Sequence, residues 1–220
     1  LAAEGVFAFF LESGFLALLL FGWNRIGPRL HYFSTVMVCV GAHFSAIWIV
    51  VANSWMQTPA GYHIVGEGMS ARAEITNFWE MVFNPSSVMR LSHTIIGAWL
   101  AGAFLLISVA AYYLLKHRFV EFAKSTLKIG LLIASVAIVL QGITGHASGK
   151  IVAKYQPAKL AAFEGLYKTQ EGASLSLFGI VDQENERIDY EVDLPKMLSF
   201  LVAEDFNAEV VGLDQVPRKD

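Results

Sequence analysis

The chain has 220 residues, of which 55% are hydrophobic and only 16% are charged. With a mean hydropathy of +0.50, this composition lies outside that of ordinary soluble domains and favours a lipid bilayer as the environment. A formal net charge of −3 leaves no excess of basic residues to attract a phosphate backbone, so nucleic-acid binding has no electrostatic support.

Four apolar stretches are each long enough to cross about 30 Å of hydrocarbon, which takes roughly 20 helical residues. They predict helices at 1–23, 32–56, 85–116 and 121–146. Because lipid cannot satisfy backbone polar groups, spanning segments of this kind are expected to be helices. We therefore predict an all-α integral membrane protein whose four helices belong to a larger bundle.

Individual residues refine this division of the chain. Gly27 and Pro28 separate the first helix from the second, and Asn84 followed by Pro85 is typical of a helix N-cap and first turn, so we expect the third helix to begin there. Cys39 lies within the second stretch and is interpreted as a small buried apolar residue. No signal-peptide flank opens the chain and no terminating element closes it, so we interpret both ends as cuts.

The distribution of Lys and Arg predicts the orientation in the membrane. The short loops after the first and third helices contain the basic residues Arg25, Arg29, Lys116, Arg118 and Lys124. Both loops are therefore expected on the cytoplasmic side. By alternation, residues 57–89 and the polar region 147–220 lie on the outer side, with a helical piece near 158–167.

Two carboxylates, Glu4 and Glu12, interrupt the first apolar stretch. Each would cost about 2.5–3.5 kcal/mol near the bilayer centre, so a function is expected. Eight helical residues give about 12 Å of rise and roughly 80° of rotation, a spacing that suits successive stations of a proton relay. Ser13 and Ser45 could extend the relay. The alternative for each residue is a structural hydrogen bond between helices.

His93, near the outer end of the third helix, is a candidate haem ligand. Gly97 and Ala101 follow it at i+4 and i+8, and their small side chains leave room for a flat ring. The same residues also suit close helix packing, and the imidazole could simply bond a carbonyl. His43 and His146 compete for the ligand role, and only His146 lies at the depth of His93.

Lys159 and Glu164 flank Phe163 in the polar region. Five residues apart on a helix, they lie about 140° from each other, which is poor geometry for an intrahelical salt bridge. They could present a cation and a carboxylate to a quinol headgroup, with Glu164 accepting a phenolic proton and Lys159 stabilising the anion. An exposed charged turn is the simpler interpretation.

Six short runs occur in an order and spacing that are specific in combination. They are 4–13, 21–25, 45–57, 84–85, 93–94 and 159–164. Together they resemble subunit I of the cytochrome bd family of terminal oxidases. The resemblance covers nearly the whole chain, although the loop before the third helix and the residues beyond Gly179 match loosely.

The resemblance implies roles for the candidate residues. His93 would be an axial ligand of a low-spin haem b, and Lys159 with Glu164 would be the quinol-site pair of an external loop, the Q-loop, that forms 147–220. The path of protons to the oxygen-reducing haems would include Glu4, Glu12, Ser13 and Ser45.

The resemblance also implies cofactors and partners. The complete subunit would hold a second haem b and either haem d or a further haem b. It would act in a bacterial or archaeal cytoplasmic membrane on a membrane quinol, with oxidase subunit II and a small single-helix subunit. In this family the remaining haem ligands belong to helices outside 1–220, so these residues alone are expected neither to bind the full haem set nor to reduce oxygen.

The predicted function is therefore part of a quinol oxidase that passes electrons through haem b to oxygen, which it reduces to water with charge separation across the membrane. One alternative is a haem b electron carrier without oxygen chemistry that uses His93 and His146 as ligands. A second alternative is an ion-coupled transporter in which Glu4 and Glu12 bind the coupling cation.

Overall fold

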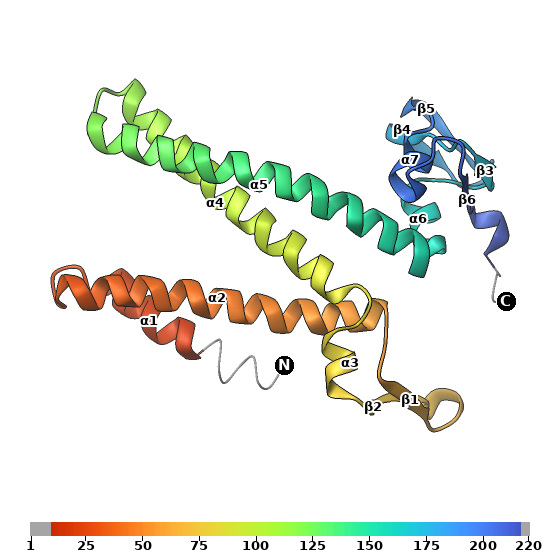
Figure 1. The fold of residues 1–220 in the computed structure, drawn as a ribbon, viewed down its shortest axis with the longest axis horizontal. Coiled ribbons are helices and arrows are strands. Elements are labelled where there is room, and N and C mark those ends of the chain that lie inside the picture. Colours follow the sequence, from red (N-terminus) through yellow and green to blue (C-terminus); the bar gives the residue numbers. More distant parts are fainter. Residues whose placement is uncertain (1–9, 217–220) are drawn as a thin grey trace. The chain divides into compact units, whose positions relative to one another are not determined.

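The computed structural model of the chain describes residues 10–216, which belong to two compact units that meet between Gln141 and Gly142 (Figure 1). The helices are α1 (Phe10–Phe21), α2 (Pro28–Gln57), α3 (Phe78–Val82), α4 (Ser87–Leu115), α5 (Val120–Tyr155), α6 (Pro157–Phe163) and α7 (Met197–Ala203). The strands are β1 (Tyr62–Val65), β2 (Arg72–Ile75), β3 (Gln170–Glu171), β4 (Leu175–Asp182), β5 (Arg187–Leu194) and β6 (Glu209–Val210). Short 3₁₀ turns occupy Gly68–Ser70 and Leu213–Gln215.

Three of the described helices, α2, α4 and α5, are long and apolar enough to cross a membrane. Much of their surface consists of exposed large apolar side chains, as expected of helices that face lipid or further helices. This confirms the prediction of a helical membrane protein. The first predicted span, 1–23, is described only from Phe10 onward, where α1 is a shorter apolar helix.

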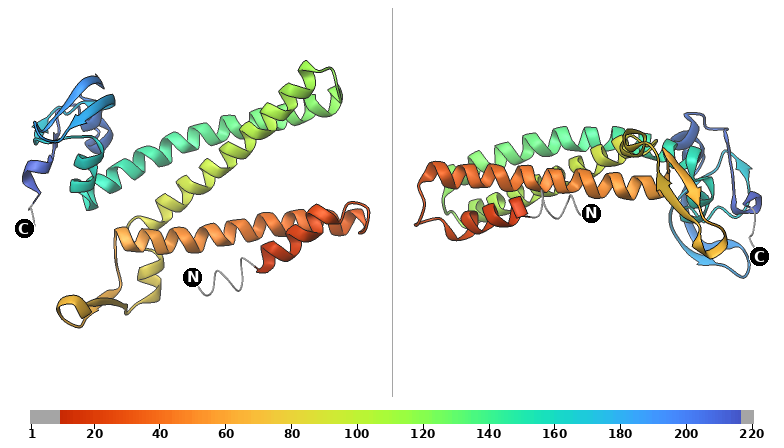
Figure 2. Two further views of the ribbon diagram at one scale, coloured as in Figure 1. Left: turned by 180° about the vertical axis from the view of Figure 1, so that it is seen from behind. Right: turned by 90° about the horizontal axis from the view of Figure 1, so that it is seen from below.

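Helix α1 runs antiparallel to the first part of α2, as the two views in Figure 2 show. The rings of Phe15 and Phe33 meet edge to face with centroids 5.6 Å apart. His31 Nε2 donates to the Leu19 carbonyl at 3.0 Å, and its ring lies 4.5 Å from that of Trp23. His31 therefore joins the start of α2 to the end of α1.

A buried polar cluster joins the end of α2 to the start of α4. Thr58 Oγ1 lies 3.0 Å from Asn84 Oδ1 and 2.7 Å from Ser86 Oγ, and the Ser86 N–H donates to Asn84 Oδ1 at 3.2 Å. These three residues are only 7%, 3% and 3% exposed. Because each polar group is hydrogen-bonded within the cluster, its burial is tolerated and the two helix ends are fixed to each other.

This cluster corrects the predicted start of the third helix. Asn84 was expected to cap the helix and Pro85 to occupy its first turn, whereas α4 begins at Ser87 with Ser86 in the N-cap position. The reason is that the Asn84 carboxamide bonds Thr58 across the loop, while the Asn84 carbonyl accepts from the Ser87 amide. Asn84 therefore tethers the two helices and does not cap one of them.

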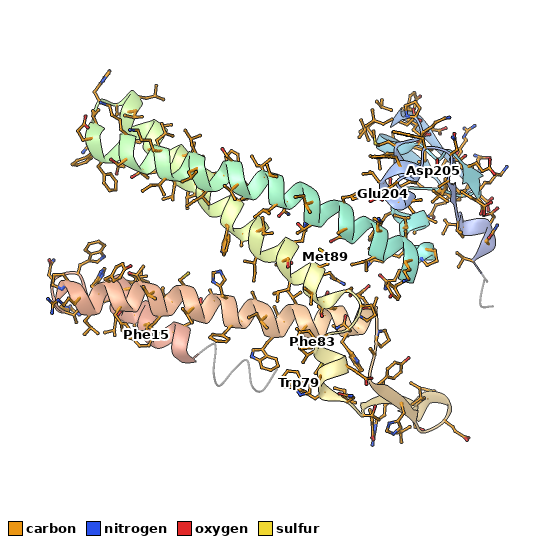
Figure 3. The ribbon with its side chains drawn as sticks, viewed as in Figure 1. Phe15, Trp79, Phe83, Met89, Glu204 and Asp205 are labelled. Atoms are coloured by element: carbon orange, nitrogen blue, oxygen red, sulfur yellow. The ribbon has the colours of Figure 1, made fainter. Side chains whose placement is uncertain are left out.

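The loop between α2 and α4 has structure that was not predicted. Strands β1 and β2 form an antiparallel hairpin in which Tyr62 pairs with Ile75. Helix α3 follows, capped by Asn77, whose side chain accepts from the amides of Trp79 and Glu80. Trp79 and Phe83 stack along α3 with centroids 6.1 Å apart and remain exposed (Figure 3).

Helix α5 extends to Tyr155, nine residues beyond the predicted end at 146. In the first unit it approaches α4 closely at Gly130, where a Cβ would come within 2.9 Å of Ile107 Cγ1. In the second unit, Val152 and Ala153 near its end pack against a small hydrophobic core. This packing explains why the helix continues past the apolar stretch that the sequence showed.

The unit Gly142–Asp220 is built around that core, whose buried members are Leu160, Ala161, Leu166, Ala173, Leu198 and Val210. Strands β4 and β5 form an antiparallel hairpin, and β3 pairs with β6. Ser199 is fully buried, where its Oγ accepts from the Ala173 amide and donates to the Ala208 carbonyl, both at 2.7 Å. The sequence predicted only a polar region with one helical piece, whereas the structure shows, up to residue 216, a small α/β unit with two short helices and four strands besides the end of α5.

The substitution Asn84→Ala tests the role of the buried cluster. It removes the acceptor shared by Thr58 and Ser86, and we expect it to destabilise the full-length protein by about 1–3 kcal/mol because those groups stay buried without that partner. The free energy of unfolding in a detergent titration measures the effect. Ser92→Ala is the control, since Ser92 Oγ bonds only back to Val88 within α4. Equal destabilisation by both changes would show that the cluster contributes nothing specific.

Candidate functional site

The residues predicted for a proton path lie on α1 and α2. Glu4 falls outside the described residues. Glu12 is half-buried in the first turn of α1, Ser13 beside it is exposed, and Ser45 is half-buried on α2. From the contact of Phe15 with Phe33, Glu12 is level with about residue 36 of the antiparallel α2, so Ser45 lies roughly 14 Å further along the helix axis. The structure therefore does not bring Glu12 and Ser45 into one site.

His93 is half-buried on α4 and contacts α5. Gln141 Nε2 lies 2.9 Å from His93 Nε2, so the amide donates to the imidazole lone pair. One turn along α4, a Cβ built on Gly97 would come 3.4 Å from the same amide nitrogen. The imidazole nitrogen and the glycine therefore both face the Gln141 amide.

His93 Nε2 carries a lone pair, which is the group that an axial haem ligand provides. His93 Nε2 accepts from the neutral Gln141 amide, whose nitrogen lies 3.4 Å from a Cβ built on Gly97. An iron ion would take the place of the Gln141 N–H as the partner of that lone pair. Sequence reasoning did not single out Gln141, although an amide within the apolar stretch 121–146 was a signal for it.

His43, which competed for the ligand role, has both ring nitrogens engaged. Trp99 Nε1 donates to His43 Nε2 at 2.9 Å, and His43 Nδ1 donates to the Cys39 carbonyl at 2.8 Å. A neutral imidazole bonded in this way connects α2 to α4 and offers no lone pair to a metal. Cys39 itself is exposed, which corrects the prediction that it is buried.

His146 lies in the second unit and takes part in an ionic contact. Glu204, which ends α7, lies 2.9 Å from Lys150 Nζ and 3.2 Å from His146 Nε2, both on α5 (Figure 3). The hydrogen bonds from Lys150 and His146 hold the pKa of Glu204 below its usual range. His93 and His146 are thus each bonded to a different residue, so these contacts give the bis-histidine alternative no support.

Lys159 and Glu164 lie at opposite ends of α6. Lys159 is half-buried, and its Nζ lies 5.6 Å from the centroid of the Phe163 ring, a cation–π contact within one turn. Glu164 occupies the C-cap position of the helix. The ion pairs given for the described residues involve other side chains.

Glu164 lines a cleft of about 330 Å³ between the end of α6 and the β4–β5 hairpin. The other lining residues are Phe163, Gly165, Ser176, Leu177, Phe178, Gly179, Val181 and Ile188. Gly165 has a φ of +61°, and a Cβ there would approach within 2.6 Å of Ile188 Cδ1, so only glycine allows the hairpin to lie this close. The sequence contained no signal for the hairpin wall of this cleft.

Burial raises the pKa of the Glu164 carboxyl above its usual range. A carboxylate with a raised pKa is a better proton acceptor near neutral pH than an exposed one. The cleft is at the lower end of the volumes that hold small ligands, about 300–1,000 Å³, and aromatic rings stand beside the carboxyl. It can therefore bind a small aromatic headgroup and accept a proton from it.

Comparisons with known proteins place these features in context. The family model described as cytochrome bd terminal oxidase subunit I matches residues 1–220. The chain is 35% identical over 214 residues to the cytochrome bd ubiquinol oxidase subunit 1 of Bacillus subtilis strain 168, covering 97% of this chain and 45% of that protein. It is 36% identical to the cytochrome bd-II ubiquinol oxidase subunit 1 of Escherichia coli K12, covering 97% and 41%.

A solved structure is similar as well. The bd oxidase from Geobacillus thermodenitrificans matches with a TM-score of 0.79 and 32% identity, covering 99% of this chain and 49% of that chain. The chain spans less than half of the length of each of these relatives.

The contact of Glu204 with α5 can be tested by Glu204→Gln, which removes the charge and keeps the shape. We expect amide hydrogen exchange in α7 to rise several-fold at neutral pH, because the bonds from Lys150 and His146 lose their charged partner. In the unaltered protein the lowered pKa of Glu204 means that this stabilisation is complete above the ordinary carboxyl pKa. It is lost only as the pH falls through the lowered value.

Hydrogen exchange read by mass spectrometry over Met197–Ala203 measures both effects. Glu191→Gln, at an exposed position of β5, is the matched control. If α7 exchanges at the same rate in both variants, the ionic contact does not hold it.

Proposed function

This chain belongs to the cytochrome bd terminal oxidase subunit I family, and on that premise we propose that it forms part of a quinol-oxidising, haem-binding subunit that passes electrons from membrane quinol to oxygen. Quinol oxidation would take place in the cleft beside Glu164. The half-buried Glu164 carboxyl, with its raised pKa at the rim of a cleft lined by Phe163 and Phe178, is the observation that supports this most directly.

The residues of the cleft would divide the work on the quinol. When a quinol becomes a quinone, it gives up two electrons and the two protons of its phenolic hydroxyls. Glu164 would accept a phenolic proton, and its raised pKa brings it nearer to the working pH. Lys159 does not line the cleft, but its ammonium contacts the ring of Phe163, which does, and from there it would stabilise the phenolate that forms. The aromatic side chains would hold the flat ring, since stacked or edge-on rings attract each other.

Haem is the cofactor that the family implies, and His93 is the residue of this chain that would hold it. A haem b bound there would supply the one-electron acceptor that quinol oxidation needs. Gln141 would then turn away from the imidazole, and Gly97 would leave room beside it. The complete subunit would carry a second haem b and a haem d or further haem b, with ligands that lie outside 1–220.

Glu12, Ser13 and Ser45 would carry protons inward, together with Glu4. Glu12 is half-buried in an apolar helix, which is an unfavourable position for a carboxylate without a function. The separation of roughly 14 Å between the levels of Glu12 and Ser45 suits stations along a path better than partners in one site. Protons released at the outer cleft and taken up from the cytoplasm would separate charge across the membrane.

The proposed setting is the cytoplasmic membrane of a bacterium or archaeon, with residues 147–220 on the periplasmic side. The basic residues of the short loops support this orientation. Oxidase subunit II is the proposed partner, and a small single-helix subunit is a further one. Because the chain spans less than half of its relatives, the 220 residues alone are proposed to be inactive.

Glu164→Gln in the full-length oxidase tests the quinol site. The amide cannot accept the phenolic proton, so we expect quinol-dependent oxygen consumption to fall by roughly 10²-fold or more. Oxygen consumption with a soluble artificial donor, which does not need the cleft, should change little. In the unaltered enzyme the quinol rate should decline as the pH falls through the raised pKa of Glu164, because the protonated carboxyl is no longer a base.

Glu171→Gln provides the matched control, because Glu171 is an exposed glutamate on β3 of the same unit. It should leave both activities unchanged. An equal loss of quinol and artificial-donor oxidation in the Glu164 variant would remove this residue from the quinol site.

His93→Ala in the full-length protein tests the haem ligand. We expect the low-spin haem b band to disappear from reduced-minus-oxidised spectra, with a lower ratio of haem to protein, because the imidazole lone pair is lost. His43→Gln should keep that band, since both nitrogens of His43 already bond protein groups. A low-spin band that survives in the His93 variant and vanishes in the His43 variant would reverse the assignment.

A further inference from the structure

Arg90 is a positive charge placed in the first turn of a membrane-spanning helix. It belongs to α4, immediately after Met89, which Figure 3 labels at the N-terminal end of that helix. The side chain is half-buried, and its Nη2 donates to Asn53 Oδ1 on α2 at 2.6 Å. This short bond fixes the guanidinium at the junction of the two helices.

Asn53 orients the guanidinium but does not neutralise it. The amide is uncharged, so the cation keeps its full charge. Within residues 10–216, the acidic side chains that form ion pairs do so with Arg72, Lys124, His146, Lys150 and Arg187, and not with Arg90. A cation held in such a position favours an anion supplied from outside the described residues.

The position of Arg90 relative to His93 indicates which anion this is. Three helical residues give about 4.5 Å of rise and a 60° difference in direction, so the two side chains leave adjacent parts of one face. Arg90 lies on the side of His93 that leads to the buried polar cluster of Thr58, Asn84 and Ser86. The cation therefore stands between the candidate haem ligand and the polar end of α4.

We propose that Arg90 binds the propionate carboxylates of the haem held by His93, with Asn53 holding the guanidinium in place. This inference rests on the proposed function, because it presupposes a haem on His93. A haem is amphiphilic, with two carboxylates on one edge of an apolar ring, so that edge belongs at the polar end of the helix. A guanidinium matches a carboxylate with two parallel N–H···O bonds, and the contact with Asn53 uses one of its five N–H donors.

Sequence reasoning passed over this pair because each residue had an ordinary interpretation. Arg90 resembles a basic residue at the border of a span, and Asn53 resembles an amide that bonds a neighbouring helix. Only the structure shows that the two side chains meet, 37 positions apart in the sequence.

The test is Arg90→Gln in the full-length protein, purified with its partner subunits and reconstituted in lipid nanodiscs. Reduction adds one negative charge to the haem, and a nearby cation favours the reduced form. We therefore expect loss of the charge to lower the equilibrium constant for reduction of the low-spin haem b about tenfold, which is ~59 mV for a one-electron couple. A redox titration of the haem b absorbance band measures the shift.

Two variants make this measurement specific. Arg90→Lys keeps the charge and should retain most of the midpoint potential, while resonance Raman spectra should show an altered propionate bending mode, because an ammonium cannot form the paired bonds. Arg118→Gln removes an arginine from the α4–α5 turn and should leave potential and spectrum unchanged. If Arg90→Gln fails to accumulate, the Raman spectrum of Arg90→Lys decides, and an unchanged propionate mode would overturn the proposal.

The outcomes separate this inference from the proposed function. A colourless unaltered protein would refute the proposed haem site itself. A normal haem in the unaltered protein, with the same midpoint potential in Arg90→Gln, would refute the role of Arg90 alone. A lipid phosphate is the rival oxygen anion for this guanidinium. If Arg90→Gln released a bound phospholipid, detected by mass spectrometry, and left the haem potential unchanged, the anion would be that headgroup and the proposal would be wrong.

Discussion

The buried hydrogen bonds among Thr58, Asn84 and Ser86 are the constraint on which the geometry of the first unit depends. They set where α2 ends and where α4 starts, and so fix the crossing of the two helices. Asn53 and Arg90 meet within the next turn of each helix, and His93 follows one turn later. A polar contact is stronger where water is excluded, so a few side chains can hold a junction that apolar packing alone would leave loose.

Further along the same helices, polar side chains are paired across the bundle. Trp99 bonds His43 between α2 and α4, and Gln141 bonds His93 between α4 and α5. In lipid such pairs orient helices, because hydrocarbon provides little preference for one apolar contact over another. The two histidines differ in one respect that decides their use. His43 Nε2 accepts from Trp99 on α4 and its Nδ1 donates to the Cys39 carbonyl of its own helix, whereas His93 Nε2 accepts from the amide at the end of the Gln141 side chain.

The sequence allowed the membrane class, the approximate positions of the long helices and the family to be predicted, because apolar runs and the break at Gly27 act locally. The second helix begins four residues earlier than predicted, at Pro28, which occupies its first turn. The family match confirms the resemblance, and residue roles such as those of His93 and Glu164 remain proposals. Helix ends were less predictable. Asn84 had the pattern of a helix cap, but its side chain instead accepts a hydrogen bond from Thr58, 26 positions away. The walls of the Glu164 cleft come from a hairpin for which no local pattern was recognised.

Two glutamates of the second unit have the same side chain but different surroundings, which give one a structural role and make the other a candidate base. Glu204 accepts hydrogen bonds from Lys150 and His146, which lower its pKa, so it stays ionised and keeps α7 attached to α5. Glu164 is half-buried at the end of α6, and desolvation raises its pKa. The two side chains have the same chemistry, but only the carboxylate whose charge is poorly stabilised gains by taking up a proton. A general base must lie next to the group that gives up the proton. The cleft lined by Phe163 and Phe178 is large enough to hold such a proton donor beside Glu164.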